Sequence, residues 1–134
     1  MFIERNCKMS FLPVMQKGSL EAAHPDRHGK ITKETVSLDG VSVTRVTFGV
    51  GASWSHDLKE YARTESCQLP HVALVLSGTL RVVMDDGSED DFRKNDVMLL
   101  PPGHDAWTIG DEPCVLSSVL AVTITTERIS RGFG

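Results

Sequence analysis

The sequence predicts an all-β fold, a small antiparallel barrel or sandwich, from three observations. Its apolar runs are short, as in His71–Leu76 and Val97–Leu100. Turn signals such as Asp85–Gly87 and Lys94–Asp96 separate these runs. No segment sustains the period of about 3.6 residues that marks an amphipathic helix. Many short strands between regularly spaced turns favour a closed or sandwiched antiparallel barrel.

Length and composition predict one globular domain. The chain has 134 residues, of which 40% are hydrophobic and 24% are charged, with a net charge of −4. It lacks the basic stripe of a nucleic-acid-binding protein, so no nucleic acid partner is expected. No apolar run is long enough to span a membrane, and the N-terminus lacks the apolar core of a secretory signal. Three widely spaced cysteines do not suggest a disulfide framework, which predicts a cytoplasmic protein.

The first predicted hairpin joins Glu34–Leu38 to Val41–Phe48 across Asp39 and Gly40. The alternation of the second strand slips near Thr44, which predicts a bulge or bend there. We divide the chain into an N-terminal extension, residues 1–30, and a barrel, residues 31–134. The extension is expected to pack on the barrel or to swap with that of a second copy.

The segment after this hairpin predicts a lid and an interface. Residues Asp57–Ser66 are polar and irregular, long enough to cover one mouth of a barrel. His71–Leu76 is apolar at consecutive positions after the histidine, which is typical of a strand covered on both faces. The barrel interior would cover one face and a second sheet or subunit the other. Together with the expected open strand edges, this predicts a homodimer.

The residues before Gly78 carry the first of two motifs. His71 lies seven positions before Gly78, and Cys67 and Glu65 lie four and six positions before His71. This spacing is similar to the first motif of the cupin family, G-x5-H-x-H-x3,4-E-x6-G. In that motif His71 takes the position of the glutamate, and Cys67 and Glu65 take those of the two histidines.

The second cupin motif, G-x5-P-x-G-x2-H-x3-N, resembles the segment that begins at Asn95. Asn95 stands at the glycine, Pro101 and Gly103 match, and Ala106 stands at the histidine. His104 lies two residues earlier, on the same face of an extended strand. The resemblance covers roughly residues 40–122 and implies a cupin jelly-roll β-barrel, also called a double-stranded β-helix. The amino-acid sequence of the chain also resembles those of the small single-domain cupins of bacteria.

The resemblance implies side chains that point inward near one barrel mouth and could hold a divalent metal. His71 and His104 offer imidazole nitrogens, Cys67 a thiolate and Glu65 a carboxylate, and His56 is a further candidate. A mixed set of nitrogen, sulfur and oxygen donors favours zinc, with iron or nickel as alternatives.

Each of these residues also has a structural interpretation. Cys67 is equally well a small buried apolar residue. His71 is alternatively a hydrogen-bonded histidine at the barrel end, and His104 a ring bonded to a carbonyl in its proline corner. Glu65 is alternatively a solvated residue of the lid.

Three further residues are candidates for lining a pocket. Trp54 and Trp107 either pack at the barrel ends or form the aromatic wall of a small-molecule site. Asp105 either orients a metal-binding imidazole or caps backbone amides in its loop.

Three functions therefore remain open. The first is a metal-binding cupin with small-molecule chemistry, whose reaction and substrate the sequence does not specify. The second is a non-catalytic module that binds or senses a small molecule without metal. The third is a mainly structural role in assembly.

Overall fold

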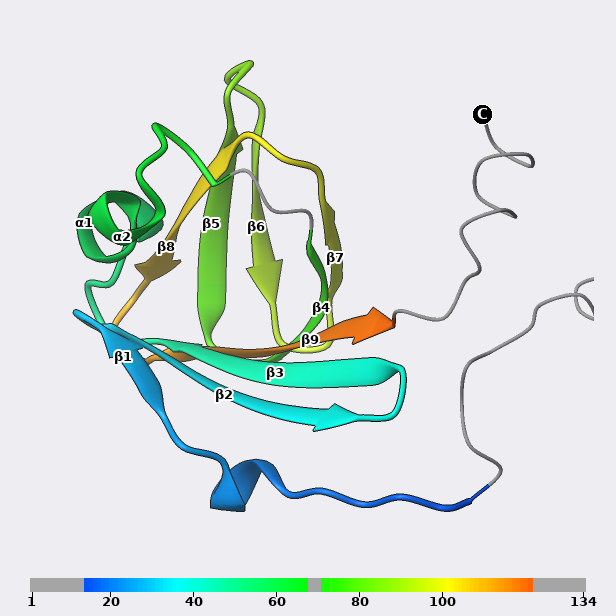
Figure 1. Ribbon diagram of the computed structural model, residues 1–134. Coiled ribbons are helices and arrows are strands. Elements are labelled where there is room, and N and C mark those ends of the chain that lie inside the picture. Colours follow the sequence, from blue (N-terminus) through cyan, green and yellow to red (C-terminus); the bar gives the residue numbers. More distant parts are fainter. Residues whose placement is uncertain (1–13, 68–70, 122–134) are drawn as a thin grey trace, which may run out of the picture.

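Two antiparallel sheets face one another in a computed structural model that describes residues 14–67 and 71–121 (Figure 1). The larger sheet has six strands in the order β1-β2-β3-β9-β4-β7, and the smaller has three in the order β6-β5-β8. The strands are β1 (Asp26–His28), β2 (Ile31–Leu38), β3 (Val41–Phe48), β4 (His71–Ser77), β5 (Thr79–Met84), β6 (Glu89–Arg93), β7 (Val97–Leu100), β8 (His104–Ile109) and β9 (Cys114–Ala121). The predicted all-β, jelly-roll arrangement is therefore confirmed.

The β2–β3 hairpin is regular along its whole length, so the bulge predicted near Thr44 is wrong. Its register runs without a shift from the pair Ile31 and Phe48 to the pair Leu38 and Val41. The alternation seemed to slip because the row in phase with Ile31 becomes polar towards the turn. There the Thr35 and Thr44 hydroxyls lie 2.9 Å apart and bond to each other across the strands.

The register does shift elsewhere, where β4 pairs with β9 between Val75 and Ser77. This irregularity lies next to Gly78, which joins β4 to β5. Gly78 has a φ of 77°, and a Cβ at this position would collide with the carbonyl oxygen of Pro113. Only glycine fits such a close approach of two backbones. Asn95, which stands at the glycine of the second cupin motif, also has a φ of 77°, a conformation that asparagine tolerates better than most residues.

Strands β4 and β7 bury one face and expose the other. The buried positions face the smaller sheet and are Ala73, Val75, Met98 and Leu100. The exposed positions alternate with them and are Val72, Leu74, Leu76, Val97 and Leu99. We call this second set the outer apolar face. Within residues 14–67 and 71–121, the chain therefore covers only one of the two apolar faces.

The described part of the N-terminal extension, residues 14–30, lies against β2 and β3. Strand β1 pairs with β2, and the carboxylate of Glu21, in the 3-10 helix η1 (Leu20–Ala22), lies 3.1 Å from the Arg45 guanidinium. The side-chain oxygen of Gln16 accepts a hydrogen bond from the backbone N–H of Asp39 at 2.9 Å. These contacts attach the extension to the outer edge of the larger sheet.

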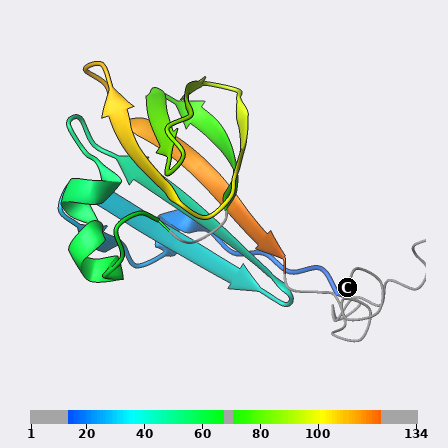
Figure 2. The ribbon, with the colours of Figure 1, turned by 90° about the horizontal axis from the view of Figure 1, so that it is seen from above.

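Two one-turn helices, α1 (Trp54–Asp57) and α2 (Lys59–Ala62), lie at one side of the molecule in both views (Figure 2). The first begins before the predicted lid, Asp57–Ser66, so residues 54–66 are called the lid from here on. Ser53 begins α1, because its hydroxyl accepts a hydrogen bond from the backbone N–H of His56 at 3.0 Å. Trp54 and Leu58 lie four residues apart and are both buried. The lid thus presents an apolar face to the interior. None of the helices in the described part of the chain could span a membrane.

Candidate functional site

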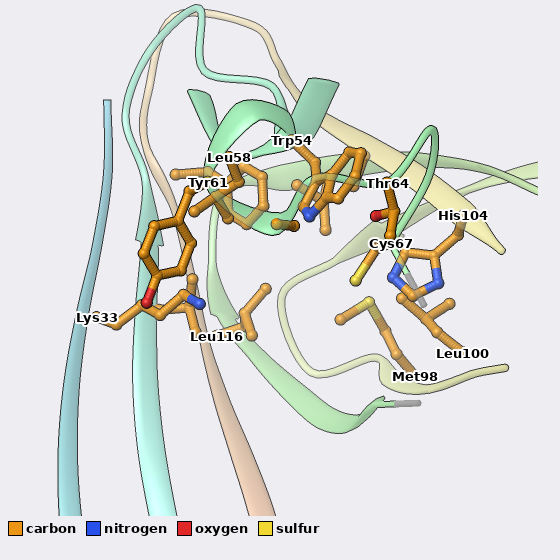
Figure 3. A pocket seen from close by; sticks show the side chains of 15 residues that line it. Lys33, Trp54, Leu58, Tyr61, Thr64, Cys67, Met98, Leu100, His104 and Leu116 are labelled. Carbon is orange, nitrogen blue, oxygen red and sulfur yellow. The ribbon is translucent and has the colours of Figure 1, made fainter. Parts of the chain in front are cut away.

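A cavity of about 370 Å³ lies between the two sheets and beneath the lid (Figure 3). Strands of both sheets and the lid contribute to its wall. Its lining is mainly apolar and consists of Lys33, Val46, Phe48, Trp54, Leu58, Tyr61, Ala62, Thr64, Cys67, Leu80, Met98, Leu100, His104, Ala106 and Leu116. The few polar side chains among these residues therefore determine what chemistry the cavity offers.

Cys67 and His104 come together because the end of the lid pairs with the start of β8. The two residues form an isolated antiparallel bridge, in which the Cys67 N–H donates to the His104 carbonyl at 2.6 Å. The Gly103 N–H donates in turn to the Cys67 carbonyl at 2.7 Å. Opposite residues of an antiparallel pair project to the same face. The thiol and the imidazole consequently lie side by side, 6% and 3% exposed.

The two nitrogens of the His104 ring have different partners. Nδ1 lies 2.9 Å from the carbonyl oxygen of Pro101, which only accepts, so Nδ1 carries a proton and donates. Nε2 points towards the Cys67 sulfur (Figure 3). Burial lowers the pKa of His104, but hydrogen bonds with Cys67 and Pro101 and the charges of Cys67 and Asp105 raise it above its usual value overall. The pair is thus arranged to share a proton between sulfur and nitrogen.

Three further polar residues line the same cavity and were not among the candidates predicted from the sequence, namely Lys33, Tyr61 and Thr64. Lys33 lies two positions after the buried Ile31 and pairs with Val46, which also lines the cavity. Strand β2 begins at Ile31, whereas the sequence predicted a strand that begins at Glu34. Lys33 therefore belongs to the strand, and because side chains alternate it faces inward like Ile31. The alternation counted from Ile31 was the signal that could have found it. Tyr61 comes from the lid, and no pattern in the sequence indicated its position.

His56 and Glu65, two of the predicted metal ligands, lie on the outer side of the lid. The His56 side chain is 79% exposed, with Nδ1 3.3 Å from the Asp57 carboxylate. The Glu65 side chain is 93% exposed and forms an ion pair with Lys59 at 2.9 Å. Helix α1 turns His56 outward and Trp54 inward, and Glu65 lies in the bend that follows α2, so neither His56 nor Glu65 lines the cavity.

Of the three residues predicted to line a pocket, Trp54 lines the cavity and the two on β8 do not. Trp54 lines the cavity from the lid. Trp107 and Asp105 do not line it, because the inward face of β8 belongs to His104, Ala106 and Thr108, which are buried. Asp105 instead accepts hydrogen bonds from the backbone N–H groups of Ser55 at 3.0 Å and Ala106 at 2.8 Å. Its carboxylate therefore attaches the lid to β8.

His71 begins β4 and pairs with Leu100, a residue of the cavity wall. The side chain of His71 lies outside the described part of the structure. Cys67 and His104 are thus the two predicted ligands whose described side chains meet. No group of three histidine, cysteine or acidic side chains that could hold a metal occurs among the described residues. These residues alone do not complete a site, because a structural zinc site uses four ligands and a catalytic one three.

Comparison with known proteins gives the fold. No family model and no curated protein matches the chain. Among solved structures, the cupin domain of Schizosaccharomyces pombe Cnp3 is 20% identical, with a TM-score of 0.58 over 87% of this chain and 80% of that one. The polyketide cyclase RemF from Streptomyces resistomycificus is 15% identical, with a TM-score of 0.60 over 84% and 86%. A cupin 2 conserved barrel protein from Salinispora arenicola is 17% identical, with a TM-score of 0.59 over 88% and 95%.

The protein has the cupin fold, as its motifs predicted. These similar structures include a polyketide cyclase and a domain of Cnp3. One fold thus carries different functions, so the function of this chain has to be argued from its own cavity.

Proposed function

We propose that this cupin-fold protein binds a small, largely apolar molecule in the cavity between its sheets. The cavity volume of about 370 Å³ falls within the range of about 300–1,000 Å³ that is usual for ligand sites. Its wall is mainly apolar, and such a wall favours a ligand that buries apolar surface.

The observation that carries this proposal is the Cys67–His104 pair in that wall. The Cys67 thiol and the His104 imidazole are hydrogen-bonded to each other, which leaves the Cys67 sulfur as a polarisable acceptor for a polar group of the ligand. Pro101 fixes the orientation of the ring through Nδ1. A few precisely oriented polar groups in an apolar cavity are how small-molecule sites obtain specificity.

The test uses 1-octanol as a probe and the melting temperature of the full chain as readout. We expect 1-octanol to raise the melting temperature in proportion to its binding. Ala62→Trp, at an exposed position that lines the cavity, should narrow the entrance and weaken this effect. Glu60→Trp is the matched control, since Glu60 lies on the same helix but does not line the cavity. A melting temperature that 1-octanol leaves unchanged in the wild type contradicts the proposal.

A second candidate is the metal-binding function predicted from the sequence, which the adjacency of Cys67 and His104 favours. These two side chains supply one sulfur and one nitrogen donor on the same wall. With His71 as a third ligand, such a set suits zinc, with iron or nickel as alternatives.

Metal content distinguishes the two candidates. We expect elemental analysis of protein purified without chelator to show stoichiometric metal only if the second candidate holds. The double variant His71→Ala, His104→Ala would then lose it. A metal-free protein whose thermal stability does not change on addition of zinc, iron or nickel contradicts metal binding and leaves the first proposal standing.

A further inference from the structure

Lys33 is a charged residue on the inward face of a strand, in a cavity with a mainly apolar wall. Its position in β2 follows the buried Ile31 by two residues, and its partner across the β2–β3 hairpin is Val46. Both Lys33 and Val46 line the cavity. An ammonium group placed among apolar side chains is costly unless it meets water or a negative charge.

None of the ion pairs among the described residues includes Lys33. The acidic residue opposite it in the sheet register is Asp26, on β1. The Asp26 carboxylate lies 3.1 Å from Nε2 of His28 and is directed to that ring instead. Within the described part of the chain, no carboxylate pairs with the Lys33 ammonium group.

The polar groups of the cavity lie at two ends of it (Figure 3). Lys33, from β2, and Tyr61, from α2, lie at one end, and both line the cavity. Thr64, Cys67 and His104 lie at the other end, and apolar side chains, Leu116 among them, occupy the space between. The Tyr61 ring is held there by packing on His28, with ring centroids 4.1 Å apart.

We propose that the ligand is an amphipathic carboxylate, whose anionic group binds Lys33 and Tyr61 and whose apolar body fills the cavity towards His104. This inference rests on the proposed small-molecule function and names the class of ligand. An ammonium and a carboxylate form a charge-assisted hydrogen bond. Tyr61 is 67% exposed, so this end of the cavity opens to solvent and an anionic group can enter there. The Tyr61 hydroxyl supplies a second, neutral donor to the same group.

A purely structural role for Lys33 makes a different prediction. A lysine can cover apolar surface with its methylene chain while its ammonium group stays in water. In that case replacing the ammonium group alone would not affect which ligands bind. Lys33→Met separates the two roles, because methionine keeps a long unbranched side chain and removes the charge.

The experiment compares octanoate with 1-octanol, two probes with the same apolar chain, by isothermal titration calorimetry. We expect the wild type to bind octanoate about tenfold more tightly than 1-octanol, the effect of one charge-assisted hydrogen bond. Lys33→Met should remove this preference and leave the affinity for 1-octanol unchanged. Lys94→Met is the matched control, since Lys94 lies exposed in the turn between β6 and β7 and the same charge is lost.

Three results would overturn the inference. Equal affinities for the two probes in the wild type contradict an anion site but leave the small-molecule proposal intact. Equal weakening of both probes by Lys33→Met assigns Lys33 a packing role alone. If neither octanoate nor 1-octanol binds, both the small-molecule proposal and the anion site are contradicted.

A wild-type measurement keeps the inference falsifiable if Lys33→Met fails to fold. Raising the salt concentration should weaken octanoate binding and leave 1-octanol binding unchanged, because only a charged contact is screened. An octanoate affinity that does not fall with salt overturns the anion site.

Discussion

The two faces of the larger sheet differ sharply at β4 and β7, although the same strands form both. Leu99 and Leu100 are neighbours in the chain, yet Leu99 is 76% exposed and Leu100 is 6% exposed. The inner face lines the cavity, and the Cys67–His104 pair lies in the same cavity on β8 of the smaller sheet and the end of the lid. The outer apolar face, which includes Val72, Leu74 and Leu76, is not covered by any segment in the described part of the chain.

This difference shows that an apolar strand face need not be a core face. The inner face is apolar because it packs against the smaller sheet and the lid. A contiguous exposed apolar face is typical of an interaction surface. The homodimer predicted from the sequence stays a prediction, and the outer apolar face is the surface that it would use.

The largest contrast is expected between Leu100→Ala and Leu99→Ala. Leu100→Ala should lower the free energy of unfolding by about 3 kcal/mol at every protein concentration, because it enlarges the cavity within one chain. Leu99→Ala should cost at most about 0.5 kcal/mol in dilute protein. The cost of Leu99→Ala should grow with protein concentration if a second copy of the chain covers Leu99. Urea unfolding at two concentrations measures both effects, and equal costs would contradict the assignment of the faces.

A charged substitution on the outer apolar face tests whether two copies of the chain associate through it. Val97→Lys should weaken dimerisation by about 100-fold, because it buries an unpaired ammonium group in the interface. Val50→Lys, at an exposed valine outside the outer apolar face, is the matched control and should not affect it. Sedimentation velocity gives the dissociation constants. A wild type that is monomeric at micromolar concentration refutes the homodimer.

The two free cysteines in the described part of the chain should react at different rates. Cys114 is fully buried, and burial together with the charge of Glu112 raises its pKa to about 11. Cys67 lies in the cavity wall beside His104, which can take its proton.

In a Cys7→Ser background, iodoacetamide at about pH 8 should label Cys67 at least about tenfold faster than Cys114. Mass spectrometry of peptides follows the two rates, and His104→Gln should slow only the labelling of Cys67. Equal rates at the two cysteines would show that His104 does not activate the thiol.

The smallest effect concerns pH. The folded state raises the pKa of His104 above 6.5, so it holds the proton more tightly than the unfolded chain does. The resulting stabilisation is fully present below pH 6.5 and is lost as the pH rises through the higher, folded-state value. Urea unfolding measures the difference in free energy of unfolding between the wild type and His104→Gln. This difference should be larger at about pH 6 than at about pH 8, by about 1 kcal/mol or less. The opposite trend would contradict the raised pKa.

The strands and turns could be predicted from the sequence because their signals are local. Val41–Phe48 forms a strand with the predicted bounds. Asn95 and Gly78 stand where the two cupin motifs have a glycine, and both have a positive φ. Each signal depends on the backbone preference of one or two residues and on alternation, which neighbouring residues determine. The cupin fold follows from the order and spacing of such signals.

Only the tertiary structure decided which candidate residues meet. Cys67 reaches His104 because the end of the lid pairs with β8, a contact between segments far apart in the chain. Helix α1 carries His56 outward, and Glu65 lies exposed in the bend after α2. The pairing of β2 with β3 places Lys33 opposite Val46, on the inward face. A shift of one residue in a strand exchanges its two faces, so side-chain direction depends on long-range pairing that local sequence does not encode.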